Sequence, residues 1–95
     1  MAHGRVKFRV HALQRMFQRK ISEEAVAQVL DTGETIEHYP DDTPYPSMLV
    51  LGWLGSRPIH VVVADDAVNE TRIVITAYQP DAQEWEGGFR RRRKP

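Results

Sequence analysis

The sequence predicts an α+β domain in which an N-terminal helical hairpin packs on an antiparallel sheet of three to four strands. Between residues 10 and 33, apolar side chains recur every three or four positions, which is typical of helices that bury one face. From residue 34 to residue 78, the period falls to two and β-branched residues become frequent, which is typical of strands.

The stretch HALQRMFQRK, residues 11–20, is expected to form the first helix. One side of this helix, preceded by Val10, carries apolar residues at the spacing of a buried stripe: Leu13, Met16 and Phe17. The opposite side carries basic residues four positions apart: His11, Arg15 and Arg19. We therefore expect the apolar side to face the core. The basic row is either a binding surface or an ordinary solvated helix face.

A second helix is expected to begin at Ser22, whose hydroxyl can accept a hydrogen bond from a backbone N–H of the first turn. Val26, Val29 and Leu30 have the spacing of its buried stripe. Gly33 is expected to end the helix in a left-handed conformation. The two helices then form a hairpin.

Four segments have the composition of strands: residues 34–39, 47–54, 58–64 and 71–78. A short strand within residues 6–9 is a further candidate. Gly55-Ser56 suits a two-residue turn with Gly at the first central position, which would place Leu51 opposite His60 and Trp53 opposite Pro58. The helices are expected to cover one face of the sheet. The other face is either partly open or covered by the C-terminal segment.

The formal net charge of zero conceals an uneven distribution of charge. Counting Lys and Arg against Asp and Glu gives +6 for residues 1–20, −11 for residues 21–86 and +5 for residues 87–95. This asymmetry predicts a basic pole that holds a polyanion or is covered by an acidic partner. A disordered solubilising end is the alternative for residues 87–95.

The 95 residues are expected to form one domain, with a core over residues 11–86 and a basic tail over residues 87–95. The absence of cysteine excludes disulfides and thiolate metal sites. No apolar run is long enough to cross a bilayer, and the N-terminus lacks the apolar core of a secretory signal. We therefore expect a cytoplasmic protein with no membrane partner.

The four histidines lack the close spacing of metal ligands: His3, His11, His38 and His60. The paired aspartates at 41–42 and 65–66 suit turns. No metal or other cofactor is therefore expected. His60 lies within an apolar run, where a buried imidazole requires a hydrogen-bond partner. Tyr78 ends the following strand, and whether it shares a face with His60 depends on a register that the sequence does not determine. The alternatives to a functional role are that His60 is a half-buried strand residue and that Tyr78 is a sheet-edge residue.

Four blocks of the sequence together resemble a bacterial family catalogued as a domain of unknown function. They are H-A-x-x-R-M-x-x-R-x-I-S from residue 11, Y-P-D-D-x-P-Y-P-S-x-L-x-L-G from residue 39, R-P-x-H-V-V from residue 57 and I-T-x-Y-x-P-D from residue 75. That family is distantly similar to the RelE- and ParE-type toxins of toxin–antitoxin pairs, which place a helical hairpin against an antiparallel sheet. Many RelE-type members are mRNA endonucleases neutralised by an antitoxin, whereas ParE-type members poison gyrase.

The resemblance implies a metal-independent RNA endonuclease or RNA-binding protein, with RNA or the ribosome and an acidic antitoxin as partners. Metal-free RNA cleavage requires an acid, a base and cations on the phosphate. The acid/base candidates are His60, Tyr78 and His11. The candidate phosphate contacts are Arg15, Arg19, Arg90, Arg91, Arg92 and Arg93. The alternative is a non-catalytic interaction module or homodimer of the same fold.

Overall fold

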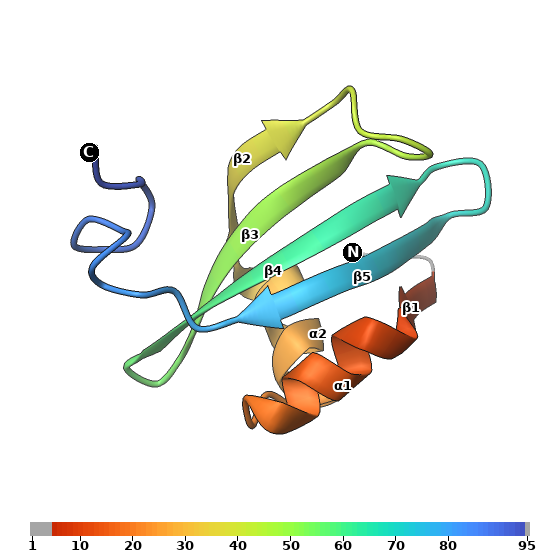
Figure 1. The fold of residues 1–95 in the computed structure, drawn as a ribbon. Coiled ribbons are helices and arrows are strands. Elements are labelled where there is room, and N and C mark those ends of the chain that lie inside the picture. The colour runs from red at the N-terminus through yellow and green to blue at the C-terminus, as the bar shows by residue number, and fades with distance from the viewer. Residues whose placement is uncertain (1–4, 95) are drawn as a thin grey trace.

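The computed structural model describes residues 5–94 as two helices on one face of a five-stranded sheet (Figure 1). The elements follow in the order β1 (Arg5–Phe8), α1 (Val10–Gln18), α2 (Glu23–Thr32), β2 (Glu34–Tyr39), β3 (Ser47–Leu54), β4 (Arg57–Asp66) and β5 (Thr71–Tyr78). The strand order is β1-β5-β4-β3-β2. The predicted α+β class and helical hairpin are confirmed.

The sheet differs from the expected three to four antiparallel strands. β1 pairs with β5 in parallel, so the sheet is mixed and has five strands. Arg5 lies beside Thr71 in this pairing. No turn motif predicts a contact between segments so far apart in sequence. The β3–β4 hairpin follows the predicted register, with Leu51 opposite His60.

The core lies between the helices and the sheet. Cross-strand partners share a face, so Val50, Val61 and Ala77 lie together on the helix side. The buried cluster on that side consists of Ala12, Met16, Ile21, Val26, Val29, Val50, Ile59, Val61, Val63, Val74 and Ala77.

The predicted buried stripe of α1 is wrong. Met16 is buried as expected, but Val10, Leu13 and Phe17 are 68%, 37% and 87% exposed. The helix instead turns Ala12 and Met16 to the sheet, and these are its two buried residues. These two residues and Arg19 also follow the i, i+4, i+7 spacing of one helix face. In a helix of nine residues, the apolar periodicity did not distinguish the buried stripe of Ala12 and Met16 from the exposed stripe of Val10, Leu13 and Phe17.

α2 begins as predicted, because the Ala25 N–H donates to the Ser22 hydroxyl over 3.0 Å. Its predicted left-handed end is wrong. Gly33 has φ −80° and ψ 179°, which is an extended conformation. A Cβ atom at this position would lie 2.4 Å from the Val29 carbonyl oxygen and 2.6 Å from that of Leu51. Glycine is therefore required here by the close approach of two backbones.

Residues 79–94 pack on the face opposite the helices, over the part of the sheet that holds His60 and Tyr78. Trp85, which is 2% exposed, packs there against His60, and Leu49 and Leu51 of β3 are buried on the same face. The covering segment folds back on itself, with Glu86 N–H donating to the Arg91 carbonyl and Arg93 N–H donating to that of Glu84. In Figure 1 this segment lies on the far side of the sheet from α1 and α2.

Within residues 5–94, no helix has the length and apolar character needed to cross a membrane.

Candidate functional site

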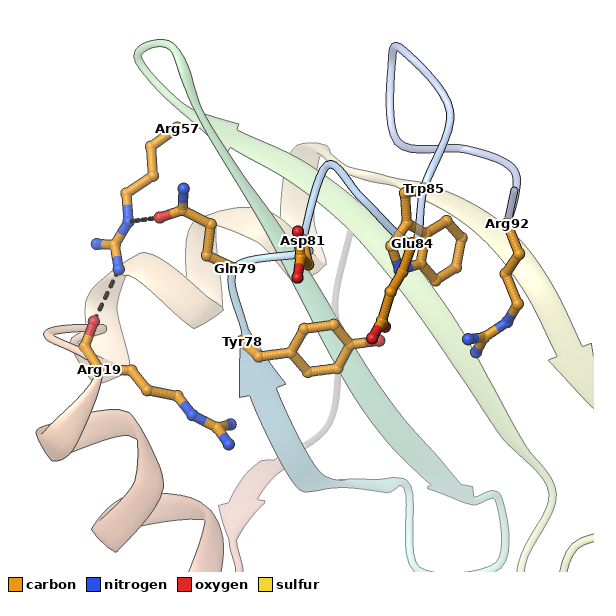
Figure 2. A pocket seen from close by; sticks show the side chains of 8 residues that line it. All are labelled: Arg19, Arg57, Tyr78, Gln79, Asp81, Glu84, Trp85 and Arg92. Atoms are coloured by element: carbon orange, nitrogen blue, oxygen red, sulfur yellow. Dashed lines mark hydrogen bonds between the residues drawn. The ribbon is translucent and has the colours of Figure 1, made fainter. Parts of the chain in front are cut away.

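A cleft of about 510 Å³ opens where the end of α1, the end of β5 and the C-terminal segment meet (Figure 2). The residues that line this Tyr78 cleft are Arg19, Arg57, Tyr78, Gln79, Asp81, Glu84, Trp85 and Arg92. Figure 2 shows Arg19 and Arg57 on one side of Tyr78 and Arg92 on the other. The lining thus combines three guanidinium groups with the carboxylates of Asp81 and Glu84, which Figure 2 shows between the arginines.

The end of α1 positions two of the arginines. Arg19 is the C-cap residue, and its Nη1 donates to the Ala77 carbonyl over 2.9 Å. Arg57 donates from Nη2 to the Arg19 carbonyl over 2.7 Å and from Nη1 to that of Lys20 over 3.0 Å. A cation at this end also complements the helix dipole. Arg57 is thus a helix cap. Arg19 uses one of the five N–H donors of its guanidinium in its hydrogen bond to Ala77.

Tyr78 is backed by a fully buried histidine. His60 and Tyr78 are cross-strand partners, and Tyr78 Oη lies 3.3 Å from His60 Nδ1. His60 Nε2 lies 2.9 Å from the Phe89 carbonyl oxygen, which can only accept. In neutral His60 the hydrogen is therefore on Nε2, and Nδ1 accepts from the Tyr78 hydroxyl. The Trp85 ring meets the imidazole edge-on, with centroids 4.4 Å apart.

Burial shifts both titrating groups toward their neutral forms. Desolvation lowers the pKa of His60, although the hydrogen bond to the Phe89 carbonyl acts in the opposite direction. Desolvation raises the pKa of Tyr78, opposed by the positive charge of Arg92. At neutral pH the pair is therefore a neutral imidazole and a protonated phenol joined by one hydrogen bond.

The C-terminal arginines are engaged with the acidic middle of the chain. Arg92 lies 4.6 Å from the centre of the Trp85 ring, and its Nε lies 3.6 Å from Glu37 Oε2. Arg90 forms a 2.8 Å ion pair with Glu34. A register shift in β2 places Glu34 and Glu37 on one face, because they stand opposite Leu51 and Leu49 of β3. Part of the predicted basic pole is therefore neutralised within the chain.

The structure brings some of the predicted site residues together. Arg19, Tyr78 and Arg92 line the cleft, and His60 lies directly behind Tyr78, where solvent does not reach it. His11 is exposed near the start of α1, about 12 Å from Arg19 along the helix axis at 1.5 Å per residue. The remaining predicted cations do not line the cleft: Arg15, Arg90, Arg91 and Arg93.

Sequence reasoning missed several lining residues. Arg57 and Asp81 lay within the quoted sequence blocks but were given no role. Gln79 and Glu84 carried no signal, because their positions depend on how the chain turns after β5.

Among residues 5–94 no group of three or more His, Cys, Asp or Glu side chains is arranged to hold a metal ion. His3 lies outside the described residues.

The fold and the cleft define a small α+β domain with an arginine-lined site around a Tyr–His pair whose histidine is buried. A family model described as "Domain of unknown function (DUF4258)" matches residues 8–79, and the chain belongs to this family. The matched range includes Arg19, His60 and Tyr78 but ends before Trp85 and Arg92. No curated protein and no solved structure matches the chain significantly.

Proposed function

We propose that the protein binds RNA in the Tyr78 cleft and cleaves it without a metal ion, in the manner of RelE-type toxins. One observation carries the proposal: guanidinium groups flank a tyrosine hydroxyl that is hydrogen-bonded to a buried, neutral histidine. The RelE-type resemblance of the sequence blocks supports it, as does a helical hairpin packed on one face of the sheet.

Arg19 and Arg92 are the proposed phosphate ligands. Both positive charges lie close enough to Tyr78 to favour its ionised form. Guanidinium groups bind phosphate oxygens through paired donors and stabilise the charge that builds on phosphorus during cleavage. Arg57 has a different role, because its donors hold the end of α1 and thereby keep Arg19 in place.

In the proposed reaction, Tyr78 and His60 act as a proton relay. The Tyr78 oxygen takes the proton of the ribose 2′-hydroxyl while its own proton passes to His60 Nδ1, 3.3 Å away. The 2′-oxygen then attacks phosphorus, and the bond to the 5′-oxygen breaks. The proton returns from His60 through Tyr78 to the leaving 5′-oxygen. The products are a 2′,3′-cyclic phosphate and a 5′-hydroxyl, and both side chains recover their initial protonation states.

In this scheme Tyr78 is the group that touches RNA. His60 is fully buried, so it acts through Tyr78. Its Nε2–H bond to the Phe89 carbonyl persists when Nδ1 gains a proton, which holds the imidazolium in place.

Cleavage of a short single-stranded RNA, free and on ribosomes, tests the proposal. Tyr78→Phe retains the ring but removes the proton path, and is expected to lower the rate about 10²- to 10⁴-fold. Tyr45→Phe is the matched control, because Tyr45 does not line the cleft. Wild-type protein that binds RNA without cleaving it would leave only an RNA-binding function. Absence of RNA binding would refute the proposal.

Expression in a bacterial host provides a second test. Growth arrest by the wild type, relieved in Tyr78→Phe, is the outcome expected of a toxin-like endonuclease. Arrest that persists in Tyr78→Phe would contradict the relay.

The second candidate function is a non-catalytic interaction module, and the exposed apolar residues of α1 favour it. It predicts that His60→Ala and Tyr78→Phe leave any cellular effect unchanged. Changes at Trp53, which is 43% exposed, would instead disturb assembly with a protein partner or a second copy, whereas Trp85, at 2% exposed, could affect assembly only through the fold.

A further inference from the structure

α1 presents an apolar row to solvent. Val10, Leu13 and Phe17, hereafter the α1 apolar surface, follow the i, i+3, i+7 spacing of a single helix face. Their exposures of 68%, 37% and 87% show that the described part of the chain leaves Val10 and Phe17 largely uncovered and Leu13 partly so. An exposed contiguous apolar row is typical of an interaction site.

The surface beside Phe17 is hollowed. One hollow of about 310 Å³ is lined by Leu13, Met16, Phe17, Ile21, Ser22 and Glu23. A second of about 310 Å³ is lined by Met16, Phe17, Lys20, Ile21 and Ser22. Apolar side chains of a partner could insert into these hollows beside the Phe17 ring, and aromatic side chains in such settings are typical anchors of protein interfaces.

The surroundings of this surface are basic. Residues 5–20 contain no acid, and the exposed cations of this stretch are Arg5, Lys7, Arg9, Arg15 and Lys20. Within the described chain, the ion pairs join Arg90 to Glu34 and Arg92 to Glu37, so none of these cations is paired there. Glu23, at the edge of one hollow, is the nearest acid in sequence. The charge therefore complements an acidic partner.

We propose that the α1 apolar surface docks an acidic, amphipathic helix of a partner protein. The row from Val10 to Phe17 spans about 10 Å at 1.5 Å per residue, which matches anchors at i, i+3 or i+4, and i+7 of one helix. RNA would satisfy the cations but leave the apolar row uncovered. A second copy of this chain would bring two basic helices together.

This site is separate from the Tyr78 cleft. Phe17 points about 160° away from Arg19 around the helix axis at 100° per residue, and none of its hollows includes a residue of the cleft. The partner helix would therefore leave the cleft open. Binding of this helix to the α1 apolar surface is thus independent of RNA cleavage in the Tyr78 cleft.

Selection from a displayed library of random 16-residue segments tests the proposal. The full chain serves as bait, and the selected peptides are then measured against Phe17→Ser and Val68→Ser. Val68, 92% exposed in the turn between β4 and β5, is the matched control for loss of an exposed apolar side chain. We expect acidic sequences with apolar residues at helical spacing, which lose about tenfold or more in affinity with Phe17→Ser and little with Val68→Ser.

Several outcomes would overturn the proposal. Selected peptides without acidic bias, or with affinities that Phe17→Ser does not change, would show that the surface does not recognise such a helix. If sedimentation equilibrium showed a dimeric wild type and a monomeric Phe17→Ser variant, the surface would be assigned to a second copy. Loss of RNA affinity in Phe17→Ser would assign it to RNA.

Discussion

The two faces of the sheet are covered in different ways. The helix face is packed by aliphatic side chains of α1 and α2 against β3, β4 and β5. The opposite face is covered around His60 by an irregular segment, residues 79–94, which is held by Trp85, two ion pairs and a hydrogen bond to His60. Apolar burial dominates the free energy of folding, whereas exposed ion pairs contribute little.

This difference separates stability from chemistry. The buried cluster of the helix face consists of apolar side chains that do not titrate, and it holds the sheet in shape. The opposite face holds the buried imidazole, the Tyr78 hydroxyl and the guanidinium of Arg92. We therefore expect substitutions on the two faces to differ in the property that they change as well as in the size of the change.

Ile59→Ala should give the largest loss of stability. Ile59 is fully buried on the helix face, and removing its side chain leaves a cavity in the core. The free energy of unfolding is expected to fall by roughly 2–5 kcal/mol, measured by urea denaturation. A loss below about 1 kcal/mol would show that this face is loosely packed.

Trp85→Ala should act mainly on the covering segment. Residues 79–94 have no regular strand, and they can detach while the sheet remains folded. The global free energy of unfolding should therefore fall less than in Ile59→Ala. Hydrogen exchange should become faster at the amides of Glu86 and Arg93 and remain slow at Val61. Equal losses of global stability in the two variants would mean that both faces unfold together.

The stability of the protein should depend on the charge of His60. Because burial lowers its pKa from 6.5, the unfolded chain binds more protons than the folded chain in mildly acidic solution. The free energy of unfolding should be greatest above pH 6.5 and fall as the pH is lowered through the folded-state pKa.

Urea denaturation of wild type and His60→Gln at pH 7.5 and pH 5 measures this contribution, since the other titrating groups are common to both proteins. The wild type should lose more stability than the variant over this interval. Equal losses would show that the folded chain does not disfavour protonated His60.

Arg92→Ala should have the smallest effect. Its ion pair with Glu37 is partly exposed, and such pairs contribute between 0 and about 1 kcal/mol. Contact with Trp85 adds to this contribution. Arg91→Ala is the matched control, because no side-chain hydrogen bond or ion pair joins Arg91 to another residue of the described range 5–94. Urea denaturation should give a loss that is larger in Arg92→Ala than in Arg91→Ala and that shrinks at high salt.

Local features were predictable from the sequence, and long-range ones were not. The Ser22 cap and the β3–β4 register depend on neighbouring residues, so the Ser22 hydroxyl and the Gly55-Ser56 turn were sufficient. The parallel pairing of β1 depends on segments more than sixty residues apart, and no local pattern encodes it.

The candidate site shows the same division. His60 and Tyr78 were recognised by residue type, but their pairing depends on a register shift after Val62 that no turn residue announces. Arg57 could not be assigned, because it caps α1 across 37 and 38 residues of sequence. The basic row of α1 was predicted as one surface, yet Arg19 turns to the sheet while Arg15 remains in solvent.

That difference between Arg19 and Arg15 permits the most direct test of the Tyr78 cleft as the RNA site. Binding of a short single-stranded RNA would be measured by fluorescence anisotropy over a range of salt concentrations, for wild type, Arg19→Gln and Arg15→Gln. The proposed function predicts that Arg19→Gln weakens binding and reduces the salt slope by about one phosphate contact, while Arg15→Gln changes neither. Equal losses in the two variants, or a loss in Arg15→Gln alone, would contradict it.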